Sequence, residues 1–195
     1  MLTAILLTSL LATNMTSTNS ANIRNNVQVR VNSEEAVMVH EQIQQNVQNR
    51  VQTRTELLEQ KRTMLQERLQ TLKDQNKQQV AMRVYTNQND LNSKFVEKYN
   101  LTLSRLSDIL TKLESAGADA TLVAKATTAI ETAQAAVDAQ SDQVYTFEVT
   151  SEDNLGQTIS TSISELRTDL TNVHNLVLAA KNAVIAVNAS LNNNE

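Results

Sequence analysis

The feature that most constrains this chain is its shortage of residues that interrupt helices. Its 195 residues include no proline and only two glycines, Gly117 and Gly156. Proline and glycine are the residues that usually mark the turns between structural elements. Because so few positions favour a turn, we expect an all-α fold built from long helices.

Aromatic residues make up only 3% of the chain, so leucine, valine, isoleucine and alanine must supply most of the core. Such side chains suit the narrow seams between packed helices, where the ridges of one helix fit the grooves of the next. We therefore predict an elongated antiparallel helical bundle of three long helices over residues 86–191. A coiled-coil-like N-terminal helical arm is expected to precede it.

Composition argues against several classes of function. The formal net charge is −4, whereas nucleic acids are bound chiefly through clustered lysine and arginine, so we expect no nucleic-acid partner. The absence of cysteine excludes disulfides, thiolate metal sites and a cysteine nucleophile. Two isolated glycines cannot form a glycine-rich phosphate-binding loop.

The N-terminal stretch resembles an export signal. No charged side chain precedes Arg24, and Ala4 to Ala12 is a compact apolar run. The run is too short to span a bilayer but has the length of a signal-peptide core. We predict a signal peptide over residues 1–21 and an extended linker over 22–33. The alternative is an ordinary apolar helix that docks on the core.

The next segment carries a heptad pattern and is predicted to form one long helix or coiled-coil arm over residues 34–85. Seven-residue spacing of apolar side chains is typical of a coiled-coil seam. The seam that we predict as the interaction surface consists of Val51, Leu58, Leu65, Leu69 and Leu72. This helix either extends from the bundle as an arm or folds back on it as a fourth helix.

Which of these arrangements forms depends on where the chain turns. Two polar stretches, Asp74 to Gln79 and Thr86 to Asn92, follow the seam without a glycine or proline. A kink or a turn is expected in one of them. A continuous helix would instead be about 120 Å long at about 1.5 Å per residue.

The second half carries clearer boundaries. Gly117 fits the left-handed position that ends a helix, and Asp119 can cap the next one. An alanine-rich helix is predicted from Ala120 to about Thr146. Ser151 then predicts the start of the last helix, with Gly156 early inside it. Residues 192–195 are expected to form a disordered tail.

The layout of the second half resembles a known group of proteins. It rests on the segments Leu103–Leu110 and Lys112–Asp119, the alanine-rich helix after them, and Val149–Asp153 before a last helix rich in alanine and valine. This order is similar to that of small secreted or periplasmic helical proteins of candidate-phyla-radiation (Patescibacteria) bacteria, over about residues 56–190. The resemblance implies an exported helical protein and no site residues.

No catalytic or metal-binding constellation stands out. His40 and His174 are far apart and lack acidic or histidine neighbours at ligand spacing, whereas zinc takes three or four protein ligands. We therefore expect no enzyme activity, no metal and no cofactor. Arg54, Lys61 and Arg68 form a basic stripe beside the heptad. We interpret this stripe as charge that flanks a coiled-coil seam. The alternative is a binding surface for an anionic partner.

These observations predict a non-enzymatic, secreted or periplasmic protein of the cell envelope. Its role would be structural or would consist of binding itself or another helical protein through helical seams. The alternative is a protein that binds lipid or a membrane surface, in which the apolar stretch Val173–Leu191 contacts lipid. No small-molecule substrate is evident from the sequence.

Overall fold

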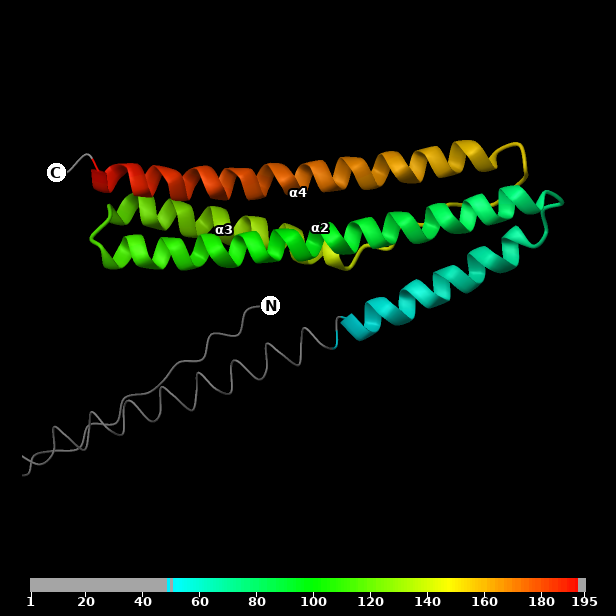
Figure 1. The fold of residues 1–195 in the computed structure, drawn as a ribbon, viewed down its shortest axis with the longest axis horizontal. Helices are drawn as coiled ribbons and strands as arrows, with labels where there is room; N and C mark the ends of the chain where they lie inside the picture. Colours follow the sequence, from blue (N-terminus) through cyan, green and yellow to red (C-terminus); the bar gives the residue numbers. More distant parts are fainter. Residues whose placement is uncertain (1–48, 50, 193–195) are drawn as a thin grey trace, which may run out of the picture. The chain divides into compact units, whose positions relative to one another are not determined.

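The computed structural model describes residues 49 and 51–192 (Figure 1). Within this range lie a helical segment at 51–69, α2 (Gln75–Ser115), α3 (Ala120–Ser141) and α4 (Leu155–Asn192), and no strand. The predicted all-α bundle of long helices is therefore confirmed. Residues 51–192 all belong to one compact unit.

Several predictions concern residues that the structure does not describe. The signal peptide at 1–21, the linker at 22–33 and the start of the long helix at residue 34 lie outside the described residues, as do positions 193–195 of the expected tail. Asn192, the first residue of that tail, is instead the last residue of α4.

The chain turns at 70–74, directly after the heptad. Asp74 caps α2: one carboxylate oxygen accepts hydrogen bonds from the backbone N–H groups of Asn76 at 2.9 Å and Lys77 at 3.2 Å. From there α2 continues without a break to Ser115. The predicted boundary between residues 85 and 86 is therefore wrong. The second polar stretch contains no turn because its side chains take part in helix packing, as described below.

The segment at 51–69 folds back on the bundle, so the prediction of a free arm is wrong and the alternative of a fourth packed helix is confirmed. Leu65, Leu69 and Leu72 are buried. The hydroxyl of Tyr85 on α2 donates a hydrogen bond of 2.7 Å to the carbonyl of Leu58. The two segments thus form a helical hairpin.

The other helical turn follows the prediction. Gly117 has φ +86°, the left-handed conformation that favours glycine. The carboxylate of Asp119 accepts a hydrogen bond of 2.9 Å from the N–H of Leu122 and caps α3. The chain therefore reverses here, and α3 runs antiparallel to α2 and α4 (Figure 1).

The alanine-rich helix is shorter than predicted. It ends at Ser141, and residues 142–150 form a non-helical segment that carries the buried side chains of Tyr145 and Phe147. With 22 residues, α3 is about 33 Å long, whereas the 41 residues of α2 span about 62 Å. The helix therefore covers about half of α2, and loop 142–154 leads the chain back to α4.

The start of α4 lies four residues beyond the predicted cap. The hydroxyl of Ser151 accepts a hydrogen bond of 3.3 Å from the N–H of Asn154, so it caps a turn that precedes the helix. The helix itself begins at Leu155 and includes Gly156 in its first turn, as expected for that glycine.

Two main groups of buried side chains hold the described residues together. The bundle core lies among α2, α3 and α4, which all contact one another; it comprises Tyr99, Leu103, Leu106, Leu110, Val123, Ala126, Ala133, Val137, Val173, Val177, Ala180, Val184 and Val187. The hairpin core joins segment 51–74, the first half of α2, loop 142–154 and the start of α4; it comprises Leu65, Leu69, Leu72, Ala81, Tyr85, Phe147 and Leu155.

Candidate functional site

The predicted interaction seam is largely used inside the chain. Leu65, Leu69 and Leu72 are part of the hairpin core, and Leu58 packs against it. Val51, by contrast, is 61% exposed. Within the chain, α2 and Phe147 cover the three buried leucines, so these side chains are not free to form the predicted interaction surface.

The basic stripe beside the seam does not form a single free surface. A guanidinium nitrogen of Arg54 donates a hydrogen bond of 3.0 Å to the hydroxyl of Ser93 on α2. Burial lowers the pKa of Arg54, while the nearby carboxylate of Asp142 acts in the opposite direction. Lys61 and Arg68 instead border a shallow hollow beside Phe147. The three residues thus have different surroundings.

A group of polar side chains is buried where α3 ends. The side-chain amide of Asn92 donates to the carbonyls of Gln140 at 3.1 Å and Gln143 at 3.3 Å. The last carbonyls of a helix have no partner within the helix, so this amide completes the C-terminus of α3. The amide of Gln140 in turn donates to the side-chain oxygen of Asn92 at 2.8 Å.

Asn89 likewise forms hydrogen bonds with the backbone of the loop that follows α3. Its side-chain oxygen accepts a hydrogen bond of 3.0 Å from the N–H of Tyr145, and its amide donates to the carbonyl of Tyr145 at 2.9 Å. One side chain therefore pairs with both backbone groups of a buried loop residue. An extended chain can be buried here only because these groups have partners.

The hydroxyl of Tyr145 closes this network. It accepts a hydrogen bond of 2.7 Å from the amide of Gln140 and donates one of 2.7 Å to the carboxylate of Asp169. Burial, followed by the hydrogen bond to Asp169, raises the pKa of this tyrosine. The phenol is thus held protonated and fully bonded. We interpret the network as structural, because its groups are directed at one another.

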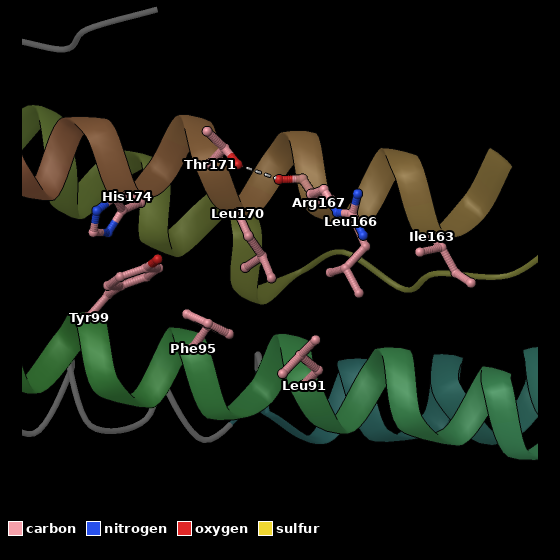
Figure 2. A pocket seen from close by; sticks show the side chains of 9 residues that line it. All are labelled: Leu91, Phe95, Tyr99, Ile163, Leu166, Arg167, Leu170, Thr171 and His174. Atoms are coloured by element: carbon pink, nitrogen blue, oxygen red, sulfur yellow. Dashed lines mark hydrogen bonds between the residues drawn. The ribbon is translucent and has the colours of Figure 1, made fainter. Parts of the chain in front are cut away.

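An open apolar groove lies between α2 and α4 (Figure 2). Its volume is about 380 Å³, and its lining comes from both helices: Leu91, Phe95, Tyr99, Ile163, Leu166, Arg167, Leu170, Thr171 and His174. Figure 2 shows the side chains of Leu91 and Phe95 facing those of α4 across the groove. Leu91 is 44% exposed, so the groove is accessible from solvent.

The groove is apolar along most of its length and carries positive or neutral polar groups. The ring of Tyr99 lies between Phe95, with ring centroids 5.7 Å apart, and His174, with centroids 6.2 Å apart. Arg167 contributes a permanent positive charge, and no carboxylate lines the groove. An arrangement of this kind can bind an apolar group and attract an anion.

Sequence reasoning did not identify this groove. The signal was available in part, because Leu91, Phe95 and Tyr99 recur every four residues and hence share a face of α2. What the sequence did not provide was the pairing of that face with Ile163 and Leu170 of α4.

The alternative prediction from the sequence placed lipid against Val173–Leu191, but most large apolar side chains of this stretch are buried or half-buried in the bundle. Val173, Val177 and Val184 belong to the bundle core, while Leu178 and Ile185 are exposed. By length and composition alone, α4 could cross a membrane. Its contacts with α2 and α3 are those of a bundle helix.

Among the described residues, no group of three or more histidine, aspartate, glutamate or cysteine side chains could hold a metal ion. No protein-family model matches the chain, and no curated protein or solved structure shows significant similarity to it. The groove between α2 and α4 is therefore put forward as the candidate site on its own geometry.

Proposed function

We propose that this protein is a non-enzymatic binding protein of the cell envelope that takes up an apolar ligand in the groove between α2 and α4. The observation that carries the proposal is an open hollow of about 380 Å³ whose lining is mostly apolar. Sites for small ligands are mostly apolar and measure roughly 300–1,000 Å³. The groove supports the lipid-binding alternative from the sequence, with the ligand on a different surface from most of the Val173–Leu191 stretch.

The surroundings of the groove support a binding role. Tyr99 and Leu170 belong to the buried clusters, so the floor of the groove is fixed by core packing. Leu91 and Ile163 at its edge are partly exposed, and burying them under a ligand would remove apolar surface from water. Export and the resemblance to secreted Patescibacteria proteins remain part of the proposal and rest on the sequence alone.

The test is binding of an uncharged environment-sensitive dye, N-phenyl-1-naphthylamine, followed by fluorescence. The wild-type protein should bind it saturably, and Leu91→Glu should weaken binding by about tenfold or more, because it places a charge in the apolar lining. Leu101→Glu is the matched control, since Leu101 is also an exposed leucine of α2, at 53%, but lies outside the groove. Equal binding by both variants, or no binding by the wild type, would refute the proposal.

A second candidate function is association with itself or with another helical protein. Leu178 and Ile185 support it, because both are exposed on α4 and, seven residues apart, share one face. The buried heptad leucines no longer do. Light scattering across a concentration series is the test: concentration-dependent oligomers that Ile185→Glu abolishes would favour this function, and a monomer at every concentration would exclude self-association.

A further inference from the structure

We infer that the ligand of the α2–α4 groove is a single-chain amphiphile with a carboxylate head, such as a free long-chain carboxylic acid. This inference rests on the proposed binding function and adds the chemistry of the ligand. Two features of the groove carry it: its elongated apolar lining and the sign of the charge at its edge.

The groove is elongated. From Ile163 to His174 it follows eleven helical steps of α4, or about 16 Å at about 1.5 Å per residue. Its volume of about 380 Å³ lies within the roughly 300–1,000 Å³ of small-ligand sites. An extended hydrocarbon chain can lie along such a groove.

The walls of the groove suit a hydrocarbon chain along their whole length. Leu91, Phe95 and Ile163 line one end, and Leu170 continues the apolar surface toward Tyr99 (Figure 2). The polar side chains in the lining are Tyr99 of α2 and Arg167, Thr171 and His174 of α4. The hydroxyl of Thr171 is already engaged, donating a hydrogen bond of 2.7 Å to the carbonyl of Arg167.

The charge at the edge favours an anionic head group. Arg167 lines the groove and is exposed, and within residues 51–192 it has no ion-pair partner. A carboxylate beside Arg167 would gain electrostatic attraction from it, whereas a cationic or uncharged head would not.

The test compares three amphiphiles with the same twelve-carbon chain, each below its micelle concentration: dodecanoate, dodecanol and dodecyltrimethylammonium. Each competes with bound N-phenyl-1-naphthylamine at low salt. Dodecanoate should displace the dye at a concentration about two- to fivefold lower than dodecanol, which is the effect expected of an exposed ion pair. Dodecyltrimethylammonium should be the weakest competitor. Raising the salt to 0.5 M should remove the difference, because exposed charges are then screened.

Two variants of equal charge change identify the cation responsible. Arg167→Gln should abolish the preference for dodecanoate while the dye still binds. Lys125→Gln, an exposed position on α3 that does not line the groove, should leave the preference intact. Equal displacement by all three amphiphiles would overturn the inference and leave the binding function standing. Failure of the dye to bind the wild type would overturn both.

Flotation with vesicles of anionic phosphatidylglycerol tests whether the protein binds the anionic head groups of a bilayer instead of a free amphiphile. We expect no flotation, because most of the large apolar side chains at the end of α4 are buried in the bundle core or packed against it. Flotation without displacement of the dye by dodecanoate would overturn the inference in favour of a bilayer surface.

Discussion

The two ends of the bundle are built in different ways. At the end where α3 lies, helices pack on helices, and the buried side chains are almost all leucine, valine and alanine. At the other end α3 is missing, and segment 51–74 and loop 142–154 take its place. Here the buried set includes two aromatic rings, Tyr85 and Phe147, and polar side chains direct hydrogen bonds to the loop backbone.

The difference follows from the hydrogen bonds that each kind of backbone can form. A helix satisfies its own N–H and C=O groups, so only its side chains need partners. An extended loop does not, and every buried N–H or C=O needs a partner from elsewhere. Asn89 and Asn92 of α2 supply these partners. Removing either asparagine or the buried ring of Phe147 should therefore destabilise this end of the bundle first.

The largest effect is expected from Phe147→Ala. The ring is buried between the hairpin and the start of α4, and truncating such a side chain costs about 3–5 kcal/mol of unfolding free energy. Hydrogen exchange should accelerate in residues 51–74 and 142–154 while α3 stays protected. The measurement is exchange followed by mass spectrometry, together with urea unfolding.

The matching variant at the other end is Leu103→Ala in the bundle core, with an expected cost of about 2–5 kcal/mol. It should reduce protection in α3 more than in the hairpin. If both variants accelerate exchange uniformly along the described chain, the two ends form one cooperative unit, and the comparison between them has no energetic meaning.

Asn89→Ala should have the next largest effect. It leaves the N–H and C=O of Tyr145 without their partner in a buried position, and each unpaired group costs about 1–3 kcal/mol. We expect a loss of about 2–4 kcal/mol, measured by urea unfolding, with the loop becoming susceptible to proteolysis. The control is Asn87→Ala at an exposed position of the same helix, which should change stability by less than about 0.5 kcal/mol. Equal effects of the two variants would contradict a backbone-pairing role for Asn89.

The contrast between the two ends also explains which parts of the fold the sequence could predict. Gly117 and Asp119 marked their turn because local residue preferences alone determine it. The turn at 70–74 contains no glycine or proline. Only its cap residue, Asp74, marks it in the sequence. The heptad indicated an apolar face, which we predicted as an interaction surface, but its periodicity carries no information about which partner covers that face; α2 of the same chain covers Leu65, Leu69 and Leu72.

The polar residues of α2 led to a wrong prediction. Gln88, Asn89 and Asn92 suggested a kink or turn, since exposed polar stretches usually mark one, yet they are buried within α2. Their partners lie about 50 residues or more away, in α3, loop 142–154 and α4, and such long-range pairing leaves no local signature. The groove escaped prediction for the same reason, because it exists only where two distant helical faces meet.

The smallest effect concerns Glu152, which ties the turn at 70–74 to the loop before α4. Its carboxylate accepts hydrogen bonds from the backbone N–H groups of Lys73 and, at 2.9 Å, of Asp74. These bonds, the one from Asp74 first, lower the pKa of Glu152 below its ordinary value of 4.5. A carboxyl group whose pKa is lower in the folded than in the unfolded state stabilises the fold above its unfolded pKa. That contribution is lost as the pH falls through the folded value.

We therefore expect Glu152→Gln to lower the melting temperature slightly at neutral pH. The gap from the wild type should close as the pH is lowered from about 5 toward 2, since the wild-type carboxyl then becomes neutral like the glutamine. Asp153→Asn removes an adjacent exposed charge and should produce no such pH-dependent gap. If the gap persists unchanged at low pH, the bonds from the turn at 70–74 to the loop before α4 do not depend on the charge of Glu152.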